Sequence, residues 1–180
     1  MVEKGNAARA CLPDGTLTGE EISCIGSCPT GWVYSGFDSK LCYFHVIKAV
    51  NYWEGKKACE DLLGTLATPK TAEEQQKINF LMQKAPWWTW IGLDDVDTEG
   101  QFTYADGASL DANSNNWSSW NSGEPNNMFG AEDCVVTAPV QGWEDRSCSD
   151  KAIAVCQVPL SEVSNTPVQP CYPGYGYHSC

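Results

Sequence analysis

Residues 124–148 read EPNNMFGAEDCVVTAPVQGWEDRSC, and the rest of the chain is best interpreted outward from this stretch. It is rich in side-chain oxygens, at Glu124, Asn126, Glu132, Glu144 and Asp145. Calcium takes about six to eight oxygen ligands, mostly carboxylates and carbonyls. Cys134 and Cys148 bracket the second half, and a disulfide between them would hold Glu132 near the last two acids. The stretch therefore predicts a calcium site, which the backbone carbonyl of Asp145 and hydroxyls from outside would complete.

The triplet Glu124-Pro125-Asn126 has two interpretations. A cis peptide bond costs far less before proline than before other residues, and it would aim both flanking side chains at one point. Proline and asparagine are also common turn residues, so the triplet by itself is more typical of a turn. The acids downstream and the bracketing cysteines favour the metal site.

Short aromatic and β-branched runs on both sides of this stretch predict strands. Residues 28–34 and 40–44 flank Ser35-Gly36-Phe37-Asp38 and indicate a hairpin, which a Cys28–Cys42 bridge would tie. Further strands are expected at residues 88–93, 101–104, 134–137 and 152–156. Residues 105–130 contain almost no aliphatic side chain. So long a polar segment in a compact domain is typically functional, disordered or held by something other than a core.

Two segments have the apolar spacing of helices. Residues 51–63 are expected to form the first, with Asn51 as its N-cap and Gly64 as its end. The second is expected to begin at Thr71, with Glu74 in the capping-box position. Its apolar stripe is Ile78, Leu81 and Met82.

Composition limits the class of protein. The formal net charge of −12 argues against nucleic acid as a partner and fits either a calcium-binding protein or a charged extracellular surface. Ten cysteines point to an oxidising compartment. No apolar run approaches the length of a membrane span, and the first residues lack an apolar signal core. Secretion is therefore inferred from the cysteines, with no transmembrane segment expected.

The 180 residues suit one domain with extensions at both ends. We expect a cysteine-containing N-terminal extension over residues 1–27, a folded domain over residues 28–160, and a Pro/Gly/Tyr-rich tail over residues 161–180. On the order of 900 pairings of ten cysteines are possible. For the extensions, the local pairs Cys11–Cys24 and Cys171–Cys180 are the first choice. Bridges between the two ends, or between chains, remain alternatives.

Taken together, these features resemble the C-type lectin domain over residues 28–160. The residues that carry the resemblance are Cys28, Cys42, Cys59, Trp90-Ile91-Gly92-Leu93, Glu124-Pro125-Asn126, Glu132-Asp133-Cys134, Trp143-Glu144-Asp145, Cys148 and Cys156. The resemblance implies an α+β, C-type lectin-like fold, in which two helices flank antiparallel sheets and a long loop binds calcium. It also implies the disulfides Cys28–Cys42, Cys59–Cys156 and Cys134–Cys148.

In that family Glu-Pro-Asn is the signature of mannose-type sugars, namely mannose, fucose, glucose and N-acetylglucosamine, whereas galactose-type members carry Gln-Pro-Asp. The resemblance implies that two neighbouring sugar hydroxyls coordinate the calcium, and that each also donates to a carboxylate and accepts from an Asn amide. One such shallow site should be weak, so avidity would come from several sites, for instance in a homo-oligomer that binds glycans or glycoproteins.

This chain departs from the family at Glu144, where the usual triplet is Trp-Asn-Asp. An asparagine supplies both a metal-binding oxygen and an NH₂ donor, whereas a carboxylate supplies oxygen alone. We therefore expect Glu144 to keep calcium binding and to remove one hydrogen-bond donor to the sugar.

Family alignment also places Asp95, Glu99, Asn127 and Glu132, with Asp133 nearby, where auxiliary calcium ligands lie. The alternative interpretation is that these acidic side chains lie in loops and are simply solvated, without binding a metal. Residues 111–123 look longer than usual and contain Trp117 and Trp120. We expect one of these tryptophans in the core and the other as a platform for a sugar ring.

Two other classes of function compete with a lectin. A structural or surface-active protein, such as a mineral-matrix or ice-binding protein, would keep the fold and lose sugar binding. An enzyme is disfavoured, because no serine or cysteine lies in a recognisable nucleophile setting. A glycosidase pair made of Glu132 and Glu144 would use residues already assigned to the metal.

Overall fold

The computed structural model describes residue 28 and residues 33–34, 41–82, 88–110, 117–138 and 141–160. The elements run in the order β1 (Val33–Tyr34), β2 (Leu41–Val50), α1 (Tyr52–Glu60), β3 (Thr65–Leu66), α2 (Ala72–Met82), β4 (Thr89–Asp94), β5 (Thr103–Tyr104), η1 (Met128–Gly130), β6 (Cys134–Ala138), β7 (Gln141–Arg146) and β8 (Ala152–Pro159). The predicted extensions 1–27 and 161–180, the pairs Cys11–Cys24 and Cys171–Cys180, and residues 111–116 lie outside the described residues.

The strands form one mixed sheet with the order β1-β2-β8-β4-β6-β7, to which β3 and β5 add at β8 and β4. The pairing of β4 with β8 is parallel, and the other pairings of described strands are antiparallel. The α+β fold is therefore as predicted, except that one mixed sheet replaces the expected antiparallel sheets. The predicted hairpin is present, because β1 pairs with β2.

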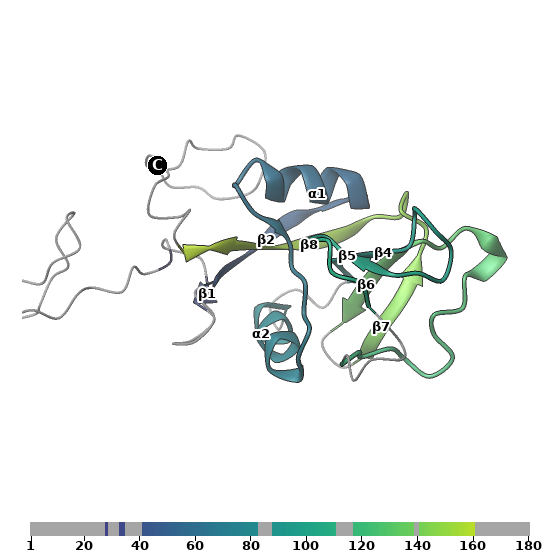
Figure 1. Ribbon diagram of the computed structural model, residues 1–180. Helices are drawn as coiled ribbons and strands as arrows, with labels where there is room; N and C mark the ends of the chain where they lie inside the picture. The colour runs from purple at the N-terminus through teal and green to yellow at the C-terminus, as the bar shows by residue number, and fades with distance from the viewer. Residues whose placement is uncertain are drawn as a thin grey trace, which may run out of the picture.

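The strands β4, β6 and β8 are buried on both faces. Figure 1 shows α1 and α2 on opposite sides of the sheet. Successive strand residues point to opposite faces. In β4, Ile91 accordingly joins a cluster with Ile78 and Leu81 of α2, while Trp90 joins a cluster with Tyr52 of α1. A strand that is covered on both faces needs apolar side chains at successive positions. Such strands therefore appear in the sequence as continuous apolar runs rather than as alternating ones.

Helix α1 begins as predicted and ends earlier. Asn51 forms a capping box with Glu54, each side chain accepting the other's backbone N–H. The helix stops at Glu60, and Leu63 rather than Gly64 takes the left-handed conformation, with φ of 59°. Gly64 is required for another reason, because a Cβ there would lie 2.3 Å from the carbonyl oxygen of Gln157 in β8.

Helix α2 follows its predicted pattern. The Thr71 hydroxyl accepts the Glu74 N–H at 3.2 Å, and Ile78, Leu81 and Met82 are buried. The Glu74 carboxylate accepts the N–H of Lys70, one residue before the position that a capping box requires. Gln75 is also buried, and its amide binds the Trp143 indole N–H and the Thr137 hydroxyl. These bonds tie α2 to the strands that carry the candidate site.

The three disulfides implied for the domain are present: Cys28–Cys42, Cys59–Cys156 and Cys134–Cys148. Cys59–Cys156 joins α1 to β8 across a sequence separation of 97 residues. Cys134–Cys148 joins β6 to the turn after β7 and so fixes the end of the sheet nearest the acidic loop. Disulfides of this kind persist in oxidising compartments.

Candidate functional site

The segment between β5 and β6 is long and polar, and backbone pairing with the edge of β7 holds it in place. The Trp143 N–H donates to the Ser119 carbonyl at 2.6 Å, and the Asn121 N–H donates to the Trp143 carbonyl at 2.9 Å. Gly142 permits this approach, because a Cβ there would lie 2.0 Å from the Ser119 oxygen. The segment therefore reaches Glu124 as an ordered extension of the sheet.

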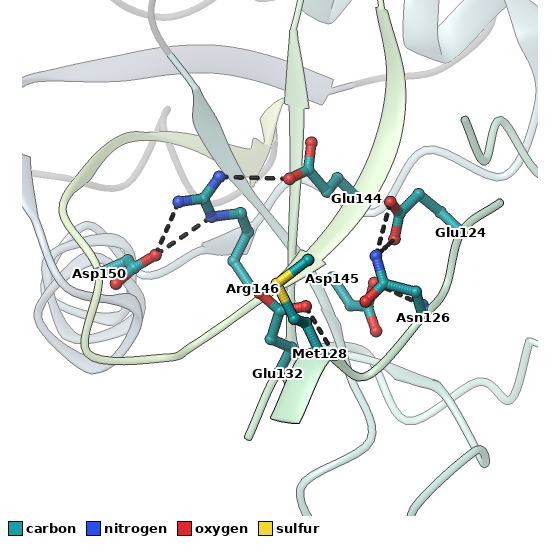
Figure 2. A network of polar contacts seen from close by, with 8 residues as sticks. All are labelled: Glu124, Asn126, Met128, Glu132, Glu144, Asp145, Arg146 and Asp150. Carbon is teal, nitrogen blue, oxygen red and sulfur yellow. Dashed lines mark hydrogen bonds and ion pairs between the residues drawn. The ribbon is translucent and has the colours of Figure 1, made fainter. Parts of the chain in front are cut away.

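Glu124 and Asn126 lie on either side of a cis peptide bond, Glu124–Pro125. The Asn126 amide nitrogen donates to both carboxylate oxygens of Glu124, each at 2.8 Å (Figure 2). Both side chains are at the surface of the molecule. A carboxylate acceptor and an amide donor are thus presented to solvent side by side.

Asp145 fixes this pair to the sheet. Its carboxylate is 1% exposed and accepts the backbone N–H groups of Asn126 at 3.0 Å and Asn127 at 2.7 Å. Hydrogen bonds to a charged acceptor are stronger than neutral ones. Asp145 also lies close enough to Glu124 to affect its protonation: partial burial raises the pKa of Glu124, and the Asp145 carboxylate raises it further.

Glu132 closes the other end of the 124–132 loop. Its carboxylate accepts the Met128 N–H at 2.9 Å, and its own N–H donates to the Asn127 side-chain oxygen at 3.2 Å. The loop is thus held at Asn126, Asn127 and Met128 by carboxylates that belong to the predicted calcium set.

Glu144 faces a different neighbour. Its carboxylate accepts from the Arg146 guanidinium at 3.2 Å, and Arg146 also binds Asp150 at 3.0 Å (Figure 2). Residues two apart on a strand share a face, whereas Asp145 between them points to the other. The structure therefore brings Glu124, Asn126, Asp145 and, through the loop, Glu132 together, and it directs Glu144 toward Arg146. The sequence analysis did not identify Arg146.

A second group of acids surrounds Asp95. This side chain is 3% exposed; its Oδ2 accepts the Gly100 N–H at 2.7 Å, while its buried Oδ1 has no hydrogen-bond partner. Burial raises the pKa of Asp95 to about 6, and the carboxylates of Glu99 and Asp133 raise it as well. Buried polar atoms are nearly always paired, so an unpaired carboxylate oxygen among acids is chemically suited to a cation.

Among the described residues, no three histidine, cysteine or acidic side chains converge tightly enough to hold a metal by themselves. The donor chemistry nevertheless suits calcium at both places, because the available groups are carboxylate and amide oxygens. Repulsion among Glu124, Asp145 and Glu144, which raises the pKa of Glu124, is of the kind that a divalent cation relieves.

Trp117 and Trp120 are both half-buried and both pack edge-on against the buried Trp143, at centroid distances of 5.5 and 5.6 Å. Neither indole is an exposed platform of the kind expected for one of them. The exposed aromatic ring of the 124–132 loop is Phe129, which is 96% exposed. Its isolation in a polar segment was the only sequence signal that could have found it.

A family model described as lectin C-type domain matches residues 48–158, which is more than half of the chain. The chain belongs to the C-type lectin domain family. Its relatives include the low affinity immunoglobulin epsilon Fc receptor of Mus musculus, 34% identical over 152 residues and 79% of this chain. This C-type lectin domain chain spans 42% of that receptor's length. The curated relatives are named as lectins and receptors.

Solved carbohydrate-recognition domains share the fold. The domain of cow CD23, solved in the presence of a GlcNAc2Man3 oligosaccharide, is 35% identical with a TM-score of 0.63, covering 74% of this chain and 97% of that one. The domain of the human scavenger receptor C-type lectin is 30% identical with a TM-score of 0.65, covering 74% and 99%. In the described part of the present chain, no helix is long and apolar enough to cross a membrane.

Proposed function

We propose that this chain is a calcium-dependent lectin that binds mannose-type sugars at the 124–132 loop. The observation that carries the proposal is the arrangement of Glu124, Asn126 and Asp145: an exposed acceptor and donor, fixed by a buried carboxylate that binds the loop's own N–H groups. A sugar hydroxyl both donates and accepts hydrogen bonds, so it can engage Glu124 and Asn126 together.

Bound calcium would supply coordination positions for two neighbouring hydroxyls. The oxygens of Glu124, Asn126, Glu132 and Asp145 would hold the calcium. We expect Glu144 to contribute least to calcium binding, because its carboxylate binds Arg146. The protein groups set the selectivity: the carboxylates accept from the hydroxyls, and the Asn126 amide donates to them. The Glu124–Asn126 pairing supports mannose-type rather than galactose-type sugars, for which the family carries Gln and Asp.

Two wider features belong to the same proposal. The disulfides support a secreted, extracellular protein. Its proposed role is to bind glycans or glycoproteins rather than to catalyse a reaction. A site built on a shallow, exposed loop binds one sugar weakly, so we propose a homo-oligomer in which several sites act together.

A glycan array probed with and without EGTA tests the proposal. We expect signals on terminal mannose, fucose, glucose or N-acetylglucosamine that EGTA abolishes. If no signal depends on calcium, the calcium-dependent lectin function is overturned, and if there is no signal at all, the fold would instead serve a structural or surface-active role at a mineral or ice surface.

Replacing Glu144 by asparagine should strengthen mannoside binding about fivefold, because it removes the ion pair that directs this side chain toward Arg146 and adds one hydrogen-bond donor worth roughly 1 kcal/mol. Asp150→Asn is the matched control, since it removes the other carboxylate that binds Arg146 without changing position 144. Calorimetric titration with methyl α-mannoside in calcium measures both. Equal affinities in E144N and the unmodified chain would show that the missing donor is irrelevant.

We also propose an auxiliary calcium site at Asp95, Glu99, Asn127, Glu132 and Asp133. Asp95→Asn should reduce the rise in melting temperature that calcium produces, because it removes the buried anionic oxygen that lacks a partner. In EDTA the same variant should melt no lower than the unmodified chain, since an asparagine oxygen still accepts the Gly100 N–H. Differential scanning calorimetry separates the two conditions, and a lower melting temperature in EDTA alone would assign Asp95 a structural role.

A further inference from the structure

The turn Met128–Gly130 displays two apolar side chains to solvent beside the candidate site. Phe129 is 96% exposed and Met128 is 50% exposed. The turn lies at the edge of the molecule, away from α1 and α2 (Figure 1). Scattered exposed apolar residues are normal on protein surfaces. Phe129 differs from these in its backbone conformation and in the way its turn is held.

Phe129 occupies the left-handed region, with φ of 59° and ψ of 14°. A bulky residue is an outlier there, and such outliers cluster at ligand-binding segments. Asn127, two residues earlier, is also left-handed with φ of 41°, but asparagine tolerates that region. Glycine would suit position 129 better if only the turn mattered, so the aromatic ring is the feature that requires an explanation.

The predicted metal ligands fix the turn in place. Asp145 accepts the Asn127 N–H, Glu132 accepts the Met128 N–H at 2.9 Å, and the Gly130 N–H donates to the Asn127 carbonyl at 2.8 Å. Figure 2 shows Met128 next to Glu132. The turn that carries the exposed ring is therefore held by the same hydrogen bonds that shape the proposed sugar site.

We infer that Phe129, with Met128, determines specificity by contacting an apolar group that the bound sugar carries, such as an alkyl or aryl aglycone. The inference rests on the proposed lectin function and adds a ligand class to it. A polar, shallow sugar site gains little affinity from hydroxyls alone, whereas an apolar aglycone that covers Phe129 removes apolar surface from water on both partners. The backbone of the turn is held by hydrogen bonds before binding, so only the side chains of Phe129 and Met128 have to be ordered against this gain.

The test compares methyl α-mannoside with hexyl α-mannoside by calorimetry in calcium, using the unmodified chain, Phe129→Ser and Phe80→Ser. Phe80 is the matched control because it is an exposed phenylalanine, 61% exposed, on α2. We expect the hexyl glycoside to bind the unmodified chain and F80S roughly five- to tenfold more tightly than the methyl glycoside. In F129S the ratio should fall to about one. Transferred NOEs between the hexyl chain and the Phe129 ring should report the contact directly.

The outcomes separate the two proposals. If the methyl glycoside binds and the ratio is the same in F129S as in the unmodified chain, the role of Phe129 is overturned while the lectin function stands. If neither glycoside binds the unmodified chain, the lectin function fails and the inference fails with it. A change of sedimentation coefficient in F129S would assign the ring to a contact between copies of the chain, which also overturns the inference.

Discussion

Replacing Asp145 by alanine should weaken calcium-dependent mannoside binding at least about 100-fold, because even outer-sphere partners of a metal are worth about 10- to 100-fold. The same change should lower the free energy of unfolding by about 3 kcal/mol. The reason is that two backbone N–H groups lose a buried, charged acceptor, each bond of this kind being worth about 1.5–3 kcal/mol. Urea denaturation and calorimetric titration measure the two effects.

Asp145→Asn separates them. An asparagine keeps one side-chain oxygen for the loop N–H groups and loses the negative charge, so we expect a smaller loss of stability and nearly the same loss of sugar binding. If D145N retained full affinity in calcium, the carboxylate would have no part in the metal site, and Asp145 would serve only to anchor the 124–132 loop.

The second large effect concerns the Cys59–Cys156 disulfide. Replacing both cysteines by alanine should lower the free energy of unfolding by about 4–5 kcal/mol, because the bridge closes a loop of 97 residues and so restricts the unfolded chain strongly. The fold should persist at low denaturant concentration, since α1 and β8 still share a buried cluster that includes Ala58 and Ala154.

The matched control is the double variant Cys134→Ala and Cys148→Ala, whose bridge spans 14 residues. We expect it to cost about 3 kcal/mol, less than the longer loop. It should also weaken calcium binding, because that bridge anchors β6 near Glu132. A larger loss of stability from the short bridge than from the long one would contradict this account of where the chain is held.

Most of the strands, both helices and the domain's disulfides could be predicted because their signals are local or belong to a resembling family. The strand β3, which has only two residues, was not predicted. The end of α1 could not be predicted. Gly64 suggests a helix terminus there, but this glycine is required by the close approach of β8, which no local sequence pattern reveals. The parallel pairing of β4 with β8 likewise depends on a contact between segments far apart in sequence.

The candidate site was predictable in its residue types and less so in its geometry. Glu144 and Asp145 are neighbours in sequence, so the sequence suggested that they act together, whereas strand alternation turns Glu144 toward Arg146. Residue type predicts one of Trp117 and Trp120 in the core and the other as a sugar platform, whereas both are half-buried and pack against Trp143. Phe129 was missed because one aromatic residue in a polar segment carries no periodicity.

Calorimetric titration of the unmodified chain with methyl α-mannoside, first in millimolar calcium and then with excess EGTA, tests the central claim most directly. The account predicts weak, saturable binding in calcium, complete loss of the heat signal in EGTA, and recovery when calcium is restored. Binding that persists unchanged in EGTA, or no binding in calcium, would contradict calcium-dependent sugar recognition at the 124–132 loop.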